Sequence, residues 1–456
     1  MAHPNIILIN CDDLGYGDLG CYVSTKTNSP HLDRLAIEGI RFTDFYVSSP
    51  VCSPSRASLM TGCYPPRIGF GEFDGRIVLF PGDPIGLSPN ETTLASQLKS
   101  AGYATKIIGK WHCGDQAEFL PTRHGFDSYF GIPYSNDMGR QPNRPDSPPL
   151  PLLRDETVIQ AQPDQRGITE RYIDESLQFI NAHQDGPFFL YLAHMYVHVP
   201  LFVPKQFLES SQNGAYGGAV ECVDWAMGVL MDHLEKQGLT QNTLIMFTSD
   251  NGSRARDEGG SNAPCRGTKA TTWEGGQRVP FIARWPGKIT ADTTCSELAT
   301  TMDLFPTISK LVDQPVNEEP IIDGLDIGDL FFSEESKSPR ESFYYYFMNN
   351  LEAIRGGEWK LHFRKNEEEI EALYNLREDP SESQNLYSDH PDIVAELQAA
   401  AEIARRDLGD DATHRPGRNR RPHGRVSQGK PLTDFDPNHP YMIAMYDKAD
   451  MPTMFG

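Results

Sequence analysis

The sequence predicts an α/β fold in which a large mixed, mostly parallel sheet is sandwiched by helices, with a smaller C-terminal α+β domain. Short apolar runs alternate with helical patterns through the first two-thirds of the chain, and this alternation favours a parallel sheet with helices on both faces. The 456 residues also exceed what one hydrophobic core usually supports. We therefore expect an α/β domain at residues 1–325, a small α+β domain at 326–408 and an extended tail at 409–456.

The elements of the large domain follow from apolar runs and stop signals. Strands are predicted at residues 5–10, 41–47, 104–108, 188–193, 243–248 and 279–284. Helices are predicted between them, at residues 31–38, 92–100, 169–183 and 215–237. The last of these has the clearest apolar stripe, and Gly238 follows it as a C-cap.

The C-terminal third has a different composition. Strands are predicted at 343–347, 353–364 and 373–376, and a helix at 391–406. The basic cluster at 414–425 is interpreted as a basic strand on an acidic body, with an anionic-substrate contact as the alternative. The Pro-rich segment at 142–151 is interpreted as a surface loop.

The net charge of −22 argues against a nucleic acid or an anionic membrane as a partner. No apolar stretch approaches the length of a membrane span. The chain opens on a strand without a signal segment, so we expect a cytoplasmic protein if the chain is complete, and a periplasmic or secreted one if a signal peptide was removed. The sequence does not define an oligomeric state.

Eight cysteines are scattered along the chain, without a CxxC pair or a zinc spacing. We interpret seven of them as buried, reduced thiols. The eighth, Cys52, lies in a distinctive motif described below.

Acidic residues follow two of the predicted strands. Asp12 and Asp13 end the first strand, and Asp250 and Asn251 end the strand at 243–248. Carboxyl ends of parallel strands are where such sheets bind ligands. Three carboxylates and an amide oxygen are hard ligands, which favour Ca²⁺ or Mg²⁺ over zinc. Either pair alone would more often be a turn or a helix cap.

The segment at 51–62 reads Val-Cys-Ser-Pro-Ser-Arg-Ala-Ser-Leu-Met-Thr-Gly, with Cys52 at a predicted helix start and Arg56 one turn later. A lone Cys-x-Pro would more often be a buried thiol. The full string resembles the signature of the formylglycine sulfatases, in which a maturase oxidises the cysteine to an aldehyde. This resemblance implies a type I sulfatase of the alkaline-phosphatase-like superfamily, with 3-oxoalanine (formylglycine) and a divalent cation as cofactors.

Further strings resemble the same family in order and spacing. Gly-Lys-Trp-His at 109–112 implies that Lys110 holds the formylglycine and that His112 acts on its hydrate. In this family a catalytic histidine stands just before an x-Pro pair that follows such a strand. After the strand at 188–193 this position is His198, so the resemblance implies that His198 is catalytic. Lys269, in Arg-Gly-Thr-Lys, implies a sulfate-binding lysine. We interpret the nearby Glu274 and Arg278 as a structural salt bridge.

The resemblance extends from Asn5 to about Leu386. The segment at 131–139 resembles the branch that holds arylsulfatase A and N-acetylgalactosamine-6-sulfatase, which implies a sulfated sugar or glycosaminoglycan fragment as substrate. Candidate specificity residues are Asp137, Arg140 and His194. His194 is equally well interpreted as a hydrogen-bonded histidine at a strand end.

The resemblance also implies a mechanism. A hydroxyl of the hydrated aldehyde at Cys52, ligated by the metal, attacks sulfur. The cation and Lys110, Lys269 and Arg56 stabilise the charge. His198, with Lys269, protonates the leaving oxygen, and His112 takes a proton from the second hydroxyl. These cations also explain how an acidic protein binds an anion.

Two alternatives stay open at this point. A phosphodiesterase or phosphonate monoester hydrolase of the same superfamily can share the modified cysteine and the metal site. A catalytically silent protein that binds sulfated glycans would result if Cys52 is never oxidised.

Overall fold

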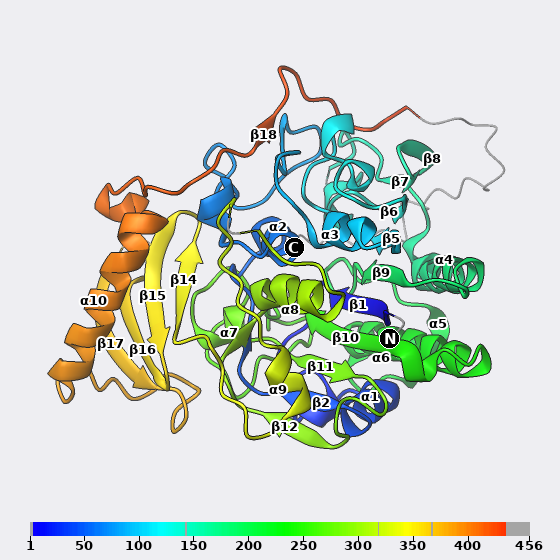
Figure 1. Ribbon diagram of the computed structural model, residues 1–456. Helices are drawn as coiled ribbons and strands as arrows, with labels where there is room; N and C mark the ends of the chain where they lie inside the picture. The colour runs from blue at the N-terminus through cyan, green and yellow to red at the C-terminus, as the bar shows by residue number, and fades with distance from the viewer. Residues whose placement is uncertain (1–2, 142–143, 318, 366–367, 435–456) are drawn as a thin grey trace.

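The centre of the structure is a ten-stranded mixed sheet (Figure 1). The computed structural model describes residues 3–141, 144–317, 319–365 and 368–434. The strand order is β12-β2-β11-β10-β1-β9-β5-β6-β7-β8, and the five strands from β10 to β6 are parallel. The bounds are β1 (Asn5–Cys11), β2 (Ile40–Phe42), β5 (Ala104–Gly109), β6 (Ser128–Gly131), β7 (Pro151–Arg154), β8 (Thr157–Ala161), β9 (Phe188–Ala193), β10 (Thr243–Ser249), β11 (Phe281–Arg284) and β12 (Thr293–Cys295).

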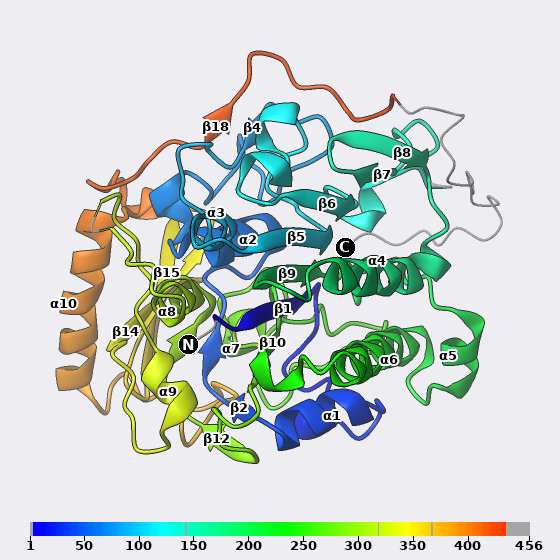
Figure 2. The same cartoon turned by 45° about the vertical axis from the view of Figure 1, so that its right-hand side comes forward.

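Helices cover both faces of this sheet, which confirms the predicted fold class (Figures 1 and 2). Successive residues of β1 point to opposite faces, so Ile6 and Leu8 join one hydrophobic core, whereas Ile7 and Ile9 join the other. The first core includes residues of α2 (Cys52–Thr61), α3 (Leu94–Ser100), α8 (Leu304–Leu311) and α9 (Gly328–Phe332). The second includes residues of α1 (Pro30–Ile37), α4 (Ile168–Ala182) and α6 (Gly214–Lys236), and α5 (Lys205–Ser210) packs on α6.

A separate four-stranded antiparallel sheet follows, with α10 (Pro391–Asp407) packed against it (Figure 1). Its strands are β14 (Ser342–Phe347), β15 (Asn350–Gly356), β16 (Trp359–Lys365) and β17 (Glu368–Asn375). The prediction of one strand at 353–364 is wrong, because Gly357 takes a positive φ of 55° and the chain reverses there into a hairpin. The predicted domain boundaries stay predictions.

The predicted strand at 41–47 also divides in two. β2 ends at Phe42, and β3 (Phe45–Tyr46) leaves the large sheet to pair with β13 (Ala299–Thr300). Between them, Asp44 accepts a hydrogen bond from Arg278 and forms an ion pair with Arg355 at 2.8 Å. These partners are distant in sequence, so the apolar pattern could not show the break.

The described part of the tail crosses the large domain as an extended segment. β18 (Gly424–Arg425) pairs with β4 (Ile85–Gly86). Arg421 binds Glu91 at 2.8 Å and Arg425 binds Asp74 at 2.8 Å. This confirms the interpretation of a basic strand on an acidic body. The predicted tail continues to 456, and its residues 435–456 lie outside the described part, as do 142–143 of the Pro-rich segment.

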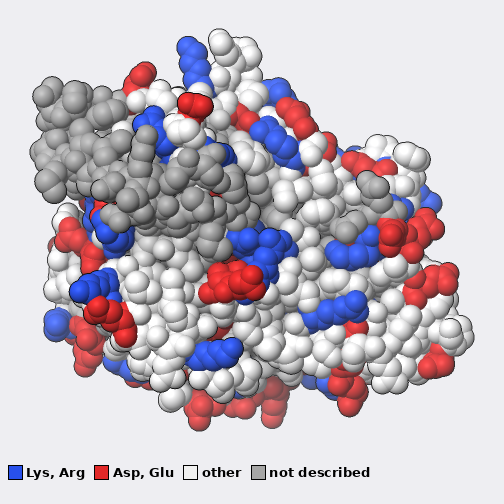
Figure 3. Space-filling view, turned by 180° about the vertical axis from the view of Figure 1, so that it is seen from behind, with Lys and Arg blue, Asp and Glu red and all other residues white. Residues whose placement is uncertain are grey.

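Acidic and basic side chains are interspersed on the face shown in Figure 3, outside the part covered by grey atoms. In the described segments, no helix combines the length and the apolar character needed to cross a membrane. All eight cysteines are free. The prediction that seven are buried is wrong for Cys21 and Cys295, which are half-buried.

Glu274 connects the two sheets through a buried network. It lies at the start of α7 (Glu274–Gln277), and its carboxylate accepts hydrogen bonds from Tyr46 at 2.6 Å, Tyr345 at 2.7 Å and Lys360 at 3.0 Å. Arg278 lies 3.6 Å from it, which confirms the predicted structural salt bridge. Burial acts to raise the pKa of Glu274, but Lys360 and the arginines lower it to about 2.

We expect Glu274→Gln to lower the free energy of unfolding by about 3 kcal/mol. The substitution removes the buried carboxylate beside Arg278 and one of the two carboxylates paired with Lys360, the other being Glu382 at 2.9 Å. The lowered pKa means that the carboxylate stabilises the fold above its ordinary pKa, and that this stabilisation is lost as pH falls toward 2. The difference between wild type and variant in urea denaturation should therefore be large at pH 7 and smaller at pH 3. Glu209→Gln, which removes an exposed pair with Lys205, is the control. Equal urea midpoints for wild type and Glu274→Gln at pH 7 would contradict the expectation.

Candidate active site

Four neighbouring parallel strands deliver the predicted site residues to one edge of the large sheet. β10, β1, β9 and β5 are adjacent, and Cys11 pairs in register with Ser249. The loops after these strands therefore begin side by side. They carry, in sheet order, Asp250 and Asn251, then Asp12 and Asp13, then His198, then Lys110 and His112.

Candidate ligand atoms for a cation meet at this edge. Asp250, a predicted ligand, lies outside the group named next, and its oxygens accept hydrogen bonds from Arg56 Nε at 2.7 Å and from the Asp13 N–H at 3.2 Å. Asp12, Asp13, Cys52 and His198 each place one ligand atom within 4.8 Å of the others. Asn251 donates to Asp13 at 2.7 Å, and its buried Oδ1 has no hydrogen-bond partner among the described residues. A buried acceptor without a donor beside three carboxylates fits a hard divalent cation.

The pKa values of Asp250 and Asp12 shift in opposite directions in this cluster. Burial raises the pKa of Asp250 to about 6, with Arg56 opposing the shift and Asp12 adding to it. Burial also acts on Asp12, but Lys110 and His198 hold the pKa of Asp12 below its ordinary value. Adjacent buried carboxylates repel each other, so a cation between them would stabilise the ionised form of both.

Cys52 begins α2, and only 1% of its surface is exposed. Pro54 occupies the first turn, where a missing N–H is harmless. The Sγ atom lies 3.5 Å from Asp12 Oδ1. Burial and the Asp12 charge raise the pKa of Cys52 to about 12, so the unmodified side chain is a protonated thiol near neutral pH and a poor nucleophile.

Arg56 lies one turn further along α2 and joins three of the strand ends. Its Nε donates to Asp250 at 2.7 Å, its Nη1 donates to the Lys110 carbonyl at 2.9 Å, and its Nη2 lies 3.6 Å from Asp12. It is 1% exposed and is not among the residues that line the cavity at Cys52. This placement makes Arg56 a residue that orients the carboxylates.

The two predicted lysines each pair with one aspartate. Lys110 binds Asp12, and Lys269 lies 2.8 Å from Asp13. Burial acts to lower both lysine pKa values, but the aspartates outweigh it and raise them. Both ammonium groups therefore stay charged beside Cys52.

His112 is oriented as a base. Its Nε2 lies 3.0 Å from the Leu79 carbonyl, which can only accept, so Nε2 carries the proton. Its Nδ1 has no hydrogen-bond partner in the described chain. Burial, and then the charge of Lys110, lowers the pKa of His112 well below its usual value, so the ring is neutral and Nδ1 can accept a proton.

The two histidines after β9 have different environments. His198 faces the site: its Nε2 lies 3.9 Å from Asp13 Oδ2, and its Nδ1 contacts the Val199 carbonyl at 2.5 Å. His194 faces away, with Nε2 3.1 Å from Thr169 Oγ1 and Nδ1 accepting the Tyr196 N–H at 3.0 Å. The interpretation of His194 as a hydrogen-bonded residue is therefore confirmed, and a substrate contact is not supported.

A cavity of about 180 Å³ opens above Cys52. His112, His198, Lys269 and Asp137 line it, whereas Arg140 and His194 do not. The other lining residues come from separate loops: Val51, Ile77, Val78, Phe80, Ser135, Met138, Arg144, Arg254, Arg256, Thr268 and Ala270. Their spacing gave no signal, except that Arg254 and Arg256 follow the predicted ligand Asn251 closely.

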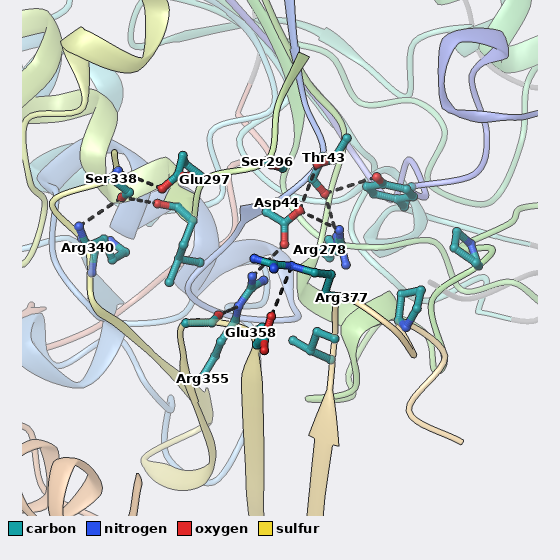
Figure 4. A pocket seen from close by; sticks show the side chains of 16 residues that line it. Thr43, Asp44, Arg278, Ser296, Glu297, Ser338, Arg340, Arg355, Glu358 and Arg377 are labelled. Carbon is teal, nitrogen blue, oxygen red and sulfur yellow. Dashed lines mark hydrogen bonds and ion pairs between the residues drawn. The ribbon is translucent and has the colours of Figure 1, made fainter. Parts of the chain in front are cut away.

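A larger cavity, of about 540 Å³, lies between the two sheets (Figure 4). Most of its charged side chains pair with one another: Asp44 binds Arg278 and Arg355, and Glu358 binds Arg377 at 3.2 Å. The other two, Glu297 and Arg340, bind Lys337 and Asp303 outside the cavity. None of the predicted catalytic residues lines it. We interpret it as a polar seam between the two parts of the chain.

The fold and the site define a hydrolase of anionic esters, with a hard-cation site, two charged lysines and two histidines around one side chain at a helix start. Residues 4–314 match the family described as Sulfatase, and residues 268–406 match "N-sulphoglucosamine sulphohydrolase, C-terminal". The chain belongs to the sulfatase family. It is a sulfuric ester hydrolase, and enzymes of this family are in general metal-dependent and formylglycine-modified.

Individual relatives agree with this assignment. N-acetylgalactosamine-6-sulfatase of Rattus norvegicus is 40% identical, covering 79% of this chain and 71% of the relative. Arylsulfatase A of Homo sapiens is 38% identical, covering 84% and 83%. The crystal structure of Ps i-CgsB in complex with k-i-k-neocarrahexaose has a TM-score of 0.79 and 30% identity, covering 88% and 92%. A phosphonate monoester hydrolase of Agrobacterium radiobacter (TM-score 0.63, 18% identity, covering 88% and 94%) shares the fold.

Proposed function

We propose that this sulfatase removes the sulfate of a sulfated sugar or glycosaminoglycan fragment, after a maturase oxidises Cys52 to formylglycine. The proposed cation is Ca²⁺, with Mg²⁺ as the alternative, because oxygen ligands suit both ions. Asp12, Asp13, Asp250, Asn251 and the modified side chain of residue 52 would hold it. The observation that carries the proposal is the convergence of this oxygen cluster, both lysines and both histidines on Cys52.

The cavity lining supports a sugar as the leaving alcohol. Phe80 is 38% exposed and lies at the cavity with Ile77 and Met138, while Asp137 and Ser135 add polar groups. An aromatic and aliphatic surface packs against the C–H face of a sugar ring, and polar side chains bind its hydroxyls. The name of the rat relative and the neocarrahexaose bound in the crystal structure also support a sugar substrate.

The side chains divide the chemistry among them. The cation, when bound, polarises the sulfate and lowers the pKa of a coordinated hydroxyl, and the hydrated aldehyde at residue 52 provides the hydroxyl that attacks. Lys110 and Lys269 neutralise the charge of the sulfate oxygens. Arg56 orients Asp12 and Asp250.

Proton transfer falls to the two histidines on the cavity wall. Lys269 Nζ, which stays charged, can place a proton on the departing alcohol oxygen. His198 can do so from Nε2 in its imidazolium form, because Nδ1 donates to the Val199 carbonyl, and burial lowers the pKa of this ring. His112 is neutral, and its free Nδ1 takes a proton at residue 52. The two histidines therefore act on opposite ends of the reaction, one as acid and one as base.

Oxidation of Cys52 is the prediction that tests this proposal. We expect a mass spectrum of the peptide containing Cys52, from protein co-expressed with a maturase, to show the mass of an aldehyde in place of the thiol. Cys222 provides an internal control, because it is a buried free thiol on α6 and should be unchanged. An active enzyme with an intact thiol at position 52 would overturn the proposal.

Activity assays then define the substrate. A panel of 2-O-, 4-O- and 6-O-sulfated hexosamines should identify the ring position, and sulfate release should exceed hydrolysis of an aryl phosphodiester under the same conditions. Faster phosphodiester hydrolysis would favour the alternative reaction. Tight binding of sulfated sugars without sulfate release would favour a silent binding protein.

A further inference from the structure

The cavity above Cys52 has a charge opposite to that of the whole protein. Four cationic side chains line it, whereas Asp137 is its one acidic lining residue in the described chain. The chain as a whole carries a net charge of −22. Charges within a Debye length dominate the local potential. Because Lys269 is paired with Asp13, the attraction for anions at the cavity comes mainly from its arginines.

One sulfate group does not account for these cations. Lys269 is assigned to the sulfate by the proposed function, together with Lys110 and the metal. Arg144 donates to the Asp137 carbonyl at 2.6 Å and so contributes to the cavity wall. Arg254 and Arg256 belong to a different loop, which begins at the metal-ligand position Asn251, and both line the cavity.

The start of that loop is held in place. Asn262 accepts the Ser253 N–H at 2.8 Å and donates to the Ser253 carbonyl at 2.8 Å, and Ser253 Oγ accepts the Ala255 N–H at 3.1 Å. Arg254 is half-buried and Arg256 is exposed. Both arginines are therefore carried on a loop that is fixed to the metal-site strand and that lines the cavity.

We propose that Arg254 and Arg256 form a subsite for a second negative charge on the leaving group, either a carboxylate or a further sulfate. The inference rests on the proposed function and deepens it: the substrate is a multiply anionic saccharide. Sulfate esters of a neutral sugar, a sterol or a phenol are poorer substrates for this site. Guanidinium groups suit this role because they bind carboxylate or sulfate oxygens through two parallel hydrogen bonds.

The test compares two aryl sulfates, phenyl sulfate and 4-carboxyphenyl sulfate, on the full-length enzyme with oxidised Cys52. Wild type should prefer the carboxylated compound, and raising the salt concentration should reduce that preference. In Arg254→Gln and Arg256→Gln the ratio of kcat/KM values, carboxylated over plain, should fall about tenfold relative to wild type. Dividing each variant's ratio by the wild-type ratio cancels the effect of the carboxylate on the intrinsic reactivity of the ester.

Arg377→Gln is the matched control, because it removes an equal charge from the seam between the sheets, away from Cys52. Its ratio should equal that of wild type. The same comparison is then made with the best hexosamine sulfate of the panel, with and without an attached uronate. If the Arg254→Gln and Arg256→Gln variants have the same ratio as the wild type, this inference is wrong, but the proposed function is not contradicted. Failure of the wild type to release sulfate from both aryl sulfates and from every hexosamine sulfate of the panel would instead overturn the proposed function.

Discussion

Cys52→Ala is expected to reduce sulfate release by at least about 10⁴-fold, because the substitution removes the atom from which the nucleophile is made. The neighbouring groups cannot replace it. His112 and His198 are placed to move protons, and Lys110 and Lys269 are kept charged by their aspartates. The measurement is kcat/KM on the best substrate of the sulfated panel, at saturating cation.

The fold of this variant should be unaffected. Position 52 is the first residue of α2, where a small side chain fits, and alanine favours a helix. Thermal unfolding of Cys52→Ala should therefore match that of wild type. Cys222→Ala deletes a buried thiol on α6 and should keep full turnover. Substantial sulfate release by Cys52→Ala would place the nucleophile elsewhere.

Removing the divalent cation is expected to lower activity at least about a hundredfold, because a large part of the charge stabilisation at sulfur is lost. The measurement is a chelator titration of the oxidised enzyme followed by addition of Ca²⁺ or Mg²⁺ alone. Ca²⁺ should restore turnover at a lower concentration than Mg²⁺. Recovery with Mg²⁺ at the lower concentration would contradict the proposed identity of the cation.

The same titration has a readout in stability. Asp12 and Asp13 are buried and place their oxygens close together, so the bound cation should raise the unfolding temperature, and the chelator should lower it. Asp13→Asn should weaken this dependence, because it removes one anionic oxygen from the cluster. Asp185→Asn, on an exposed turn, is the control and should behave like wild type. A chelator that changes neither activity nor unfolding temperature would exclude the metal site.

Most of the catalytic centre could be predicted because its residues follow strands. The buried strands are continuous apolar runs, so their ends are visible in the sequence, and the residues after those ends are brought together by parallel pairing. Asp12, Asp250 and Lys110 are examples. Cys52 was identified by its motif, and its burial and place at the start of α2 agree with that motif.

The orientation of other predicted site residues depends on contacts between residues that are distant in the sequence. The choice between His194 and His198 depends on Thr169 and Tyr196, which bind both nitrogens of His194 and turn it from the site. Arg140 was expected beside Asp137, but its side chain contacts the Ser147 carbonyl at 3.4 Å, and it does not line the cavity. Neither outcome follows from spacing along the chain.

The sequence by itself determined the central strands of the large sheet and the helices between them, the ligand types for a hard cation and the motif of the reactive cysteine, because these are local patterns of a few residues. The tertiary structure decided which side chains share the cavity. Phe80, Asp137 and Arg256 come from loops far apart in the chain, and only the packing of those loops against the sheet brings their side chains to one leaving group.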